Sequence, residues 1–166
     1  MRRVLVIGSP GAGKSTLAAG IASRTGLPLI HLDAHYWRPG WIETGKEEWA
    51  ERVNLLASGD DWVMDGNHGG TLALRLARAD TVLWLDFPVW LCLVRIVGRA
   101  LRYRGRVRPD MAEGCPERLS LEFFFYTARF PWDGRRRIVE KLPAFTETLV
   151  RLRGPREAEA YLANLA

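Results

Sequence analysis

With 166 residues, of which 48% are hydrophobic, the chain is long enough to bury a core, and we expect a single domain over residues 1–166. Its longest apolar run, Val89 to Val94, is too short to cross a bilayer, and the apolar run after Met1 is too short for a signal peptide, so we expect a cytoplasmic protein without a membrane partner. The net charge of +5 at pH 7 is compatible with nucleic acid, a membrane surface or a polyanionic small molecule. The two cysteines are too few for a four-cysteine zinc site and favour reduced thiols over a disulfide.

The first predicted strand and helix flank a glycine-rich turn. Residues 4–7 (Val-Leu-Val-Ile) form a short apolar run typical of a buried strand, and Leu17 and Ile21 follow at helical spacing. Between them, residues 8–15 read Gly-Ser-Pro-Gly-Ala-Gly-Lys-Ser, which fits the phosphate-binding pattern G-x-x-x-x-G-K-[ST]. The alternative is a turn with an accidental Lys-Ser, but the flanking strand and helix are the context that the pattern requires.

The residue types of the glycine-rich turn suit a nucleoside triphosphate. Glycines let backbone N–H groups point inward, and the helix that starts near Lys14 adds its unpaired N–H groups. Lys14 is expected to reach the β- and γ-phosphates, and the Ser15 hydroxyl is expected to bind Mg²⁺. We therefore predict ATP and Mg²⁺ as cofactors, with the nucleotide bound by Gly8, Pro10, Gly11, Ala12, Gly13, Lys14, Ser15 and Thr16.

Strands and helices alternate along the rest of the chain. Further strands are predicted at 28–32, 62–64, 81–85 and 146–152, and residues 35–41 are expected to form a loop. Helices are predicted at 46–58, 71–78, 88–103, 119–130 (from Leu119), beyond Pro131 to about 145, and after Pro155. This alternation predicts an α/β protein with the three-layer P-loop NTPase fold, in which helices cover both faces of a five-stranded parallel sheet.

Polar residues stand where the predicted strands end. Because ligands bind at the carboxyl ends of parallel strands, Gly8, Asp33, Asp65 and Asp86 are expected to converge on one cleft. Asp65 would hold Mg²⁺ together with Ser15, the alternative being a cap of the Asp-Gly turn. Asp33 would take the proton of an acceptor hydroxyl, the alternative being a helix cap or turn residue.

Positive charge is concentrated in one window of the chain. Between Asp86 and Asp110 there is no acidic residue, and the window holds Arg95, Arg99, Arg102, Arg104, Arg106 and Arg108. Residues 104–116, which are rich in Arg, Gly and Pro, are predicted to form a mobile lid. We favour phosphate contacts in this lid over a nucleic-acid patch, because Tyr103 is the only aromatic residue interleaved among these arginines.

The order of these segments resembles the nucleoside monophosphate kinase group of P-loop kinases, which includes adenylate kinase. The resemblance rests on the glycine-rich turn, on Asp65-Gly66 after the third strand and on residues 95–99 (Arg-Ile-Val-Gly-Arg) after the fourth. It implies that Arg95 packs on the ATP base and that Arg99 contacts phosphates.

A closer resemblance is to a bacterial subgroup labelled DNA topology modulation proteins, or FlaR-like proteins. It covers nearly the whole chain. It rests on Leu32-Asp33, Tyr36-Trp37, Pro39-Gly40-Trp41, the run 62–67, Arg108-Pro109-Asp110 and the run 114–117.

Two departures from adenylate kinases bear on the phosphoryl acceptor. Those enzymes carry an arginine shortly after the Asp-Gly turn, where this chain has Asn67–Gly69, and they bind the acceptor phosphate with an arginine where this chain has Asp33. A carboxylate there favours a hydroxyl acceptor, whereas Arg38 and Arg75 favour a phosphate, which both could clamp. The acceptor site is therefore predicted to involve Asp33, Arg38, Asp65, Asn67 and Arg75, with both kinds of acceptor open.

The sequence as a whole predicts an ATP- and Mg²⁺-dependent phosphotransferase. It would move the γ-phosphoryl group to a nucleoside, a nucleotide or a similar small metabolite, with Lys14, Asp33 and Arg99 as catalytic residues. One alternative is a nucleotide-binding regulator that interacts with DNA through the basic window, and another is a switch that hydrolyses ATP without an acceptor. We expect a monomer or a dimer.

Overall fold

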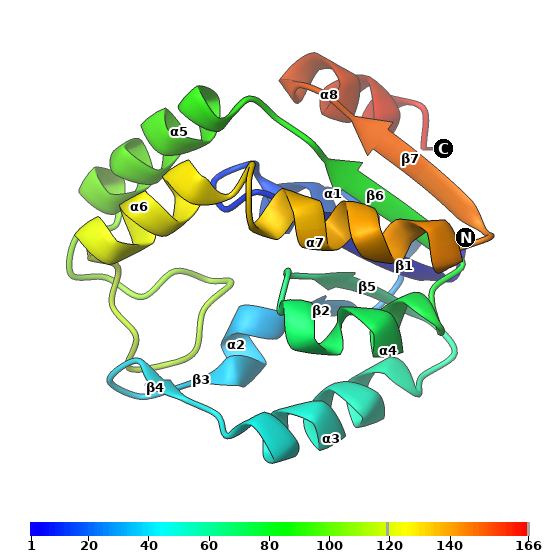
Figure 1. Ribbon diagram of the computed structural model, residues 1–166, viewed down its shortest axis with the longest axis horizontal. Helices are drawn as coiled ribbons and strands as arrows, with labels where there is room; N and C mark the ends of the chain where they lie inside the picture. Colours follow the sequence, from blue (N-terminus) through cyan, green and yellow to red (C-terminus); the bar gives the residue numbers. More distant parts are fainter. Residues whose placement is uncertain (119, 166) are drawn as a thin grey trace.

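A parallel sheet of five strands forms the centre of the computed structural model, which describes residues 1–118 and 120–165 (Figure 1). The strand order is β2-β5-β1-β6-β7, so the first strand in the chain lies in the middle. The strands are β1 (Arg3–Gly8), β2 (Leu29–His31), β5 (Trp62–Asp65), β6 (Thr81–Leu85) and β7 (Thr148–Leu152). All five lie within or close to the ranges that the sequence predicts.

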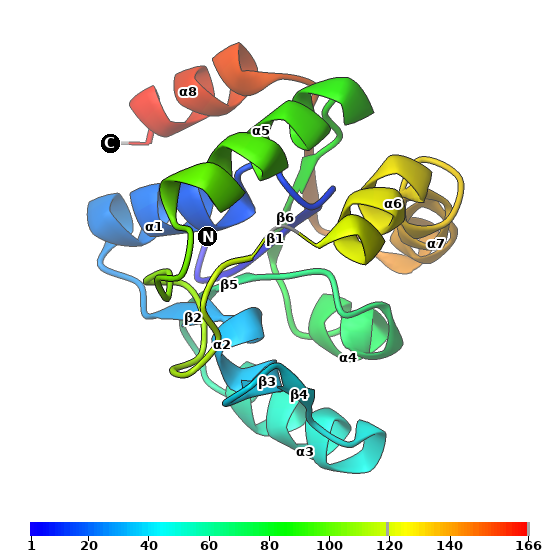
Figure 2. The ribbon, with the colours of Figure 1, turned by 90° about the vertical axis from the view of Figure 1, so that its left-hand side faces the viewer.

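Helices cover both faces of this sheet, as Figure 2 shows. On one face lie α1 (Lys14–Thr25), α5 (Val89–Arg102) and α8 (Pro155–Ala163). On the other face lie α3 (Lys46–Ala57), α4 (Leu72–Leu76) after the short turn η1 (Gly69–Thr71), α6 (Leu121–Arg129), and α7 (Gly134–Lys141) with η2 (Leu142–Ala144). The predicted α/β architecture of three layers is confirmed. Leu119, the expected start of the sixth helix, lies outside the described residues.

Alternating side chains of β1 fill two separate cores. Leu5 and Ile7 pack on the side of α3, α4 and α7, whereas Val4 and Val6 pack on the side of α1, α5 and α8. All four side chains are fully buried, and each contributes about 1.5–3 kcal/mol of burial free energy. Because successive strand residues point to opposite faces, this packing fixes the register of the central strand.

The strand register brings the carboxyl ends of three neighbouring strands to one level. Val6 of β1 pairs with Asp65 of β5, and Asp65 pairs in turn with His31 of β2. On the other side of β1, Gly8 pairs with Leu85 of β6. The glycine-rich turn therefore leaves the sheet between the tips of β5 and β6.

The segment after β2 differs from the expected loop. Leu32, which is fully buried, begins the short helix α2 (Leu32–Tyr36), and the chain then forms a two-stranded hairpin from β3 (Trp37–Arg38) and β4 (Ile42–Glu43). The hairpin turn places Gly40 and Trp41 at φ angles of 80° and 65°. A non-glycine residue rarely adopts such an angle, so apolar periodicity does not predict this turn.

The segment between α5 and α6 contacts the hairpin. The Gly40 N–H donates to the Gly114 carbonyl over 2.9 Å, and the Cys115 thiol lies 3.2 Å from the Arg38 carbonyl oxygen. Within the segment, the Gly105 N–H donates to the carbonyl of Glu117. Within residues 1–118 and 120–165, no helix combines the length and apolar character that crossing a membrane requires.

Candidate functional site

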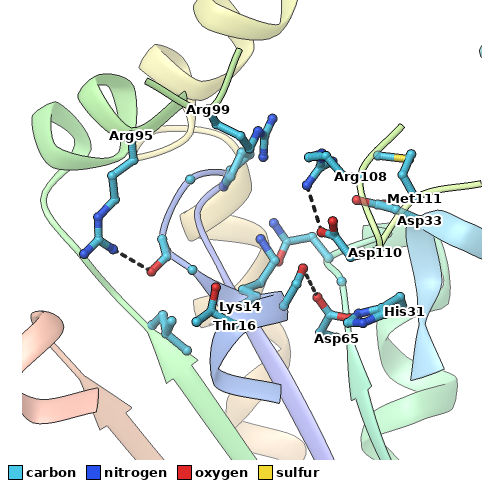
Figure 3. A pocket seen from close by; sticks show the side chains of 18 of the residues that line it. Lys14, Thr16, His31, Asp33, Asp65, Arg95, Arg99, Arg108, Asp110 and Met111 are labelled. Carbon is cyan, nitrogen blue, oxygen red and sulfur yellow. Dashed lines mark hydrogen bonds and ion pairs between the residues drawn. The ribbon is translucent and has the colours of Figure 1, made fainter. Parts of the chain in front are cut away.

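A cleft of about 1340 Å³ opens at the carboxyl ends of the strands (Figure 3). Its walls come from the glycine-rich turn, the tips of β2, β5 and β6, helix α5, the β3–β4 hairpin and the segment after α5. Elements far apart in the sequence thus meet at one edge of the sheet, as expected for a parallel sheet.

The glycine-rich turn forms the floor of the cleft. Gly11 and Gly13 have φ angles of 76° and 95°, in the left-handed region that favours glycine. A Cβ at Gly11 would also clash with the Cys92 carbonyl of α5, so the turn lies close against that helix. Gly13 is the N-cap of α1, whose first N–H groups therefore face the cleft side of the turn. This backbone is suited to bind anionic oxygens.

Lys14 folds back over the turn from which it comes. Its ammonium donates to the carbonyls of Gly8 and Ser9, over 3.2 and 3.1 Å. Burial lowers the pKa of Lys14, although the nearby carboxylates of Asp33 and Asp65 oppose this shift. A partly buried cation whose hydrogen-bond partners among the described residues are carbonyl oxygens can exchange them for phosphate oxygens, which interact more strongly with it.

Ser15, Asp65 and His31 form a chain of hydrogen bonds at the tips of α1, β5 and β2. The Ser15 hydroxyl donates to Asp65 Oδ2 over 2.6 Å, and Asp65 Oδ1 lies 2.6 Å from His31 Nδ1. The bond to Asp65 raises the pKa of His31, with burial acting against it. A hydroxyl and a carboxylate are hard oxygen donors of the kind that Mg²⁺ prefers, so these two side chains fit that ion.

Asp33 lies in the first turn of α2 and pairs with His68. Asp33 Oδ1 is 2.9 Å from His68 Nε2, and the Asp33 side chain is 48% exposed toward the cleft it lines. Burial alone would raise the pKa of Asp33, but His68, Lys14 and Arg108 outweigh it and lower that pKa below its usual value. Asp33 is therefore ionised at neutral pH.

Three arginines that line the cleft come from α5 and from the segment that follows it. Arg95 donates to the Ala12 carbonyl over 3.1 Å, with its guanidinium 5.7 Å from the Phe87 ring centre. Arg99 and Arg108 both form ion pairs with Glu117 Oε2, at 3.2 and 2.6 Å. Burial, followed by the charge of Arg108, lowers the pKa of Arg99.

Comparisons with known proteins agree with this geometry. Residues 4–67, which include the glycine-rich turn and Asp65, match the model of the "ATPase family associated with various cellular activities (AAA)". The structure resembles shikimate kinase from Bacteroides thetaiotaomicron, with a TM-score of 0.56, 18% identity, and coverage of 99% of this chain and 96% of that one. The chain has the P-loop NTPase fold. A sugar kinase from Janibacter sp. HTCC2649 also resembles it, with a TM-score of 0.50, 18% identity, and coverage of 98% and 93%.

No curated protein sequence matches the chain significantly. The adenylate kinase-like and topology modulation resemblances therefore stay predictions, whereas the P-loop NTPase fold and the structural likeness to a shikimate kinase and a sugar kinase are findings.

Most of the residues predicted for the site line the cleft. They are Pro10, Gly11, Ala12, Gly13, Lys14, Ser15, Thr16, Asp33, Asp65, Asn67, Arg95 and Arg99. Gly8 is not among the described residues that line the cleft. A Cβ at Gly8 would clash with the Leu85 carbonyl, so glycine at this position allows the turn to pack closely on β6. The Asn67 amide also bonds to both backbone groups of Gly8, accepting over 3.1 Å and donating over 2.7 Å.

Two arginines predicted to clamp an acceptor are not among the described residues that line the cleft. Arg75 is fully buried and donates to the carbonyls of Gly66 and His68, over 2.8 and 3.1 Å, and to that of Asn67. Burial lowers the pKa of Arg75 to about 9, so its guanidinium remains charged at neutral pH. Arg38 is half-exposed on the outer side of the hairpin, paired with Glu48 of α3.

The sequence did not reveal the side chains that pair with Asp65, Asp33 and the arginines, which are His31, His68 and Glu117 respectively. His31 pairs with Asp65 because β2 and β5 are neighbours in register, and this strand order becomes known only from the structure. Glu117, the first acidic residue after residues 104–116, could have been found as a counter-charge for the arginines.

Proposed function

We propose that this protein is a kinase that transfers the γ-phosphoryl group of ATP to a hydroxyl group of a small acceptor. The observation that carries the proposal is the presence of an ionised carboxylate, Asp33, in the same cleft as Lys14 and the glycine-rich turn. Binding a triphosphate needs cationic and N–H donors, and activating a hydroxyl needs a nearby base. Both are supplied by the segments that follow the carboxyl ends of β1 and β2.

The donor half of the cleft would bind the triphosphate through the glycine-rich turn. The Lys14 ammonium would exchange the carbonyls of Gly8 and Ser9 for phosphate oxygens. Ser15 and Asp65 would hold Mg²⁺, which when bound neutralises part of the phosphate charge. His31 keeps the Asp65 carboxylate oriented by its hydrogen bond.

The arginines above the cleft would complete the charge neutralisation. Arg99 Nε and Glu117 Oε2 are buried, and among the described residues they have an ion pair but no partner in hydrogen-bond geometry. Phosphate oxygens can satisfy Arg99 better than Glu117 does, because the guanidinium presents a fork of donors. We propose that Arg99 and Arg108 move from Glu117 to the phosphates when the lid segment (residues 104–116) closes, whereas Arg95, over Phe87, lies beside the nucleotide base.

The charges of the acceptor half favour a hydroxyl over a phosphate acceptor. Arg75 is engaged beneath the turn after β5, and Arg38 is paired with Glu48 outside the cleft. Arg108 pairs with Asp110, at 2.8 Å, and in this proposal its remaining donors bind the phosphates of ATP. A hydroxyl acceptor needs no additional cation, and Asp33 is positioned to accept its proton.

The positions of the arginines between Asp86 and Asp110 favour the kinase over a DNA-binding regulator. Arg99 and Arg108 are turned toward the cleft, where acidic side chains face them. Arg104 and Arg106 are exposed, and Arg102 packs its guanidinium 5.8 Å from the Tyr103 ring centre. Four of the six arginines of this window therefore line the cleft: Arg95, Arg99, Arg102 and Arg108.

One assay separates these functions. Purified protein with ATP and Mg²⁺ is screened for ADP formation against nucleosides, nucleotides, sugars and other hydroxylated metabolites, beside a control without acceptor. We expect ADP formation to depend on a non-phosphorylated hydroxyl compound. Equal ADP formation without acceptor would favour an ATPase switch, and DNA binding that weakens steeply with salt in a parallel titration would favour a regulator.

A further inference from the structure

Among the residues that the structure describes, His68 has the side chain that hydrogen-bonds to Asp33. The proposed binding of ATP assigns no role to His68. Its Nε2 lies 2.9 Å from Asp33 Oδ1. An ionised carboxylate can only accept hydrogen bonds, so Nε2 must carry the proton. The bond occupies Oδ1 of Asp33, whereas Oδ2 has no hydrogen bond to another residue that the structure describes and is available to a ligand.

The ring of His68 is fixed by aromatic neighbours. Its centre lies 4.6 Å from that of Tyr36 and 4.9 Å from that of Trp49, at interplanar angles of 56° and 54°. Only 14% of the His68 side chain is exposed. A ring enclosed in this way cannot follow a mobile carboxylate, so the hydrogen bond constrains Asp33 more than it constrains His68.

The backbone of His68 is held as firmly as its ring. Its φ of 32° and ψ of 68° lie in the left-handed region, which is uncommon for residues other than glycine, although asparagine, aspartate and histidine adopt it more often than the rest. The His68 carbonyl accepts from Arg75 and, over 2.9 Å, from the Thr71 N–H. Arg75 also donates to the carbonyls of Gly66 and Asn67, the two residues before His68. The Asn67 side chain in turn hydrogen-bonds to the backbone of Gly8.

We propose that His68 is a positioning residue for the transfer reaction. It holds Asp33 in one rotamer, so that Oδ2 is presented to the acceptor hydroxyl, and Arg75 and Asn67 hold His68 relative to the glycine-rich turn. The inference rests on the proposed kinase function and deepens it. In the transfer step the acceptor oxygen forms a bond to the γ-phosphorus, the bond from that phosphorus to the β,γ-bridging oxygen breaks with ADP leaving, and the acceptor proton passes to Asp33.

The hydrogen bond itself is tested by NMR on ¹⁵N-labelled protein. Long-range ¹H–¹⁵N spectra distinguish the two ring nitrogens of each of the three histidines, and His68→Gln assigns the His68 signals by their loss. We expect His68 to carry its proton on Nε2 and this nitrogen's shift to change in Asp33→Asn. A His68 ring protonated only on Nδ1, or a His68 spectrum unaffected by Asp33→Asn, would overturn the positioning role.

The catalytic consequence is tested with two matched variants and an acceptor found in the screen described above. His68→Phe keeps a ring against Tyr36 and Trp49 but removes the donor, so kcat should fall about 10- to 100-fold while KM for ATP stays within about twofold. His68→Gln places an amide N–H the same number of bonds from Cα and should recover most of this loss. Equal kcat in the two variants would overturn the proposal.

The two hypotheses fail in different ways. If the wild-type protein shows no acceptor-dependent turnover, the kinase assignment is overturned, and the catalytic role of His68 with it, even where NMR shows the Nε2–H bond. If the wild-type protein is active and His68→Phe has wild-type kcat, the kinase assignment stands and only the positioning role is overturned. Thermal unfolding of both variants checks that they are folded.

Discussion

At the scale of single residues, burial and neighbouring charges act in opposite directions on the pKa values of Lys14 and Asp33. Burial lowers the pKa of Lys14, and the carboxylates of Asp33 and Asp65 limit that shift. Lys14 in turn helps to keep the pKa of Asp33 low against burial. The cation and the carboxylate therefore each favour the charged form of the other, which suits a site where an anionic donor and a hydroxyl acceptor must meet.

Replacing Lys14 by Ala should abolish the measurable transfer activity. The ammonium is the partly buried cation that would interact with the β- and γ-phosphates, and loss of one such electrostatic contact costs about 10²- to 10³-fold or more in kcat. Initial rates of ADP formation at saturating acceptor measure the effect. Lys46→Ala, at the exposed start of α3, is the control and should behave like the wild type; turnover by Lys14→Ala at the wild-type rate would refute this role.

Replacing Asp65 by Asn should change the magnesium requirement. The Ser15 hydroxyl donates to the Asp65 carboxylate at 2.6 Å, and the loss of its charge should raise the Mg²⁺ concentration for half-maximal rate by about 10- to 100-fold. A Mg²⁺ titration of ADP formation measures this. His31→Gln, which changes only the partner of Asp65, should shift the midpoint less, and an unchanged midpoint in Asp65→Asn would exclude Asp65 as a metal ligand.

At the scale of elements, Asp80 joins the beginnings of β1 and β6. Its Oδ2 accepts the backbone N–H groups of Arg2 and Arg3, over 2.9 and 2.8 Å, and its Oδ1 accepts the Thr81 hydroxyl over 2.7 Å. Burial tends to raise the pKa of Asp80, but these hydrogen bonds lower it overall. The cleft lies at the carboxyl ends of these strands. The hydrogen bonds of Asp80 at their amino ends therefore stabilise the strands that lead into the site.

Replacing Asp80 by Asn should lower stability and alter its dependence on acid pH. The folded-state pKa is below the unfolded value, so ionised Asp80 stabilises the protein above the unfolded pKa near 4, and this contribution is lost as pH falls through the folded pKa. We expect Asp80→Asn to unfold with about 1–3 kcal/mol less free energy at pH 7 and to lose less than the wild type on acidification. Urea unfolding at pH 7 and at pH 3 measures both; a parallel acid dependence in the two proteins would contradict the assignment.

At the scale of the whole molecule, the order of the strands determines which site residues meet. Periodicity and turn residues predict all five strands, and the glycine-rich turn and the aspartates at strand ends follow from them. The contact of His31 with Asp65 depends on β2 lying beside β5, and local patterns do not encode strand order. The burial of Arg75 was also unpredictable, because an arginine on a short helix reads as a surface residue until its carbonyl partners are known.

The contacts between the β3–β4 hairpin and residues 104–116 could not be predicted from local patterns either. Residues 104–116 were recognised by composition, but their contact with the β3–β4 hairpin joins Gly40 to Gly114, which are far apart in the chain. The left-handed conformation of Trp41 is likewise maintained by tertiary contacts, including the hydrogen bond from its indole to the Pro116 carbonyl. Tertiary contacts, and not the local propensity of the residue, therefore explain the conformation of Trp41.

The most direct test of the whole account uses a small-molecule extract of cells as a complete pool of acceptors. Wild-type protein and Asp33→Asn are incubated with ATP, Mg²⁺ and the extract, and ADP formation and new phosphorylated compounds are followed by mass spectrometry. We predict that the extract stimulates ADP formation by the wild type, that one hydroxyl compound gains a phosphoryl group, and that Asp33→Asn is slower by about 10²- to 10⁴-fold while still binding ATP. An extract that does not stimulate the wild type, or that stimulates both proteins equally, would contradict the account.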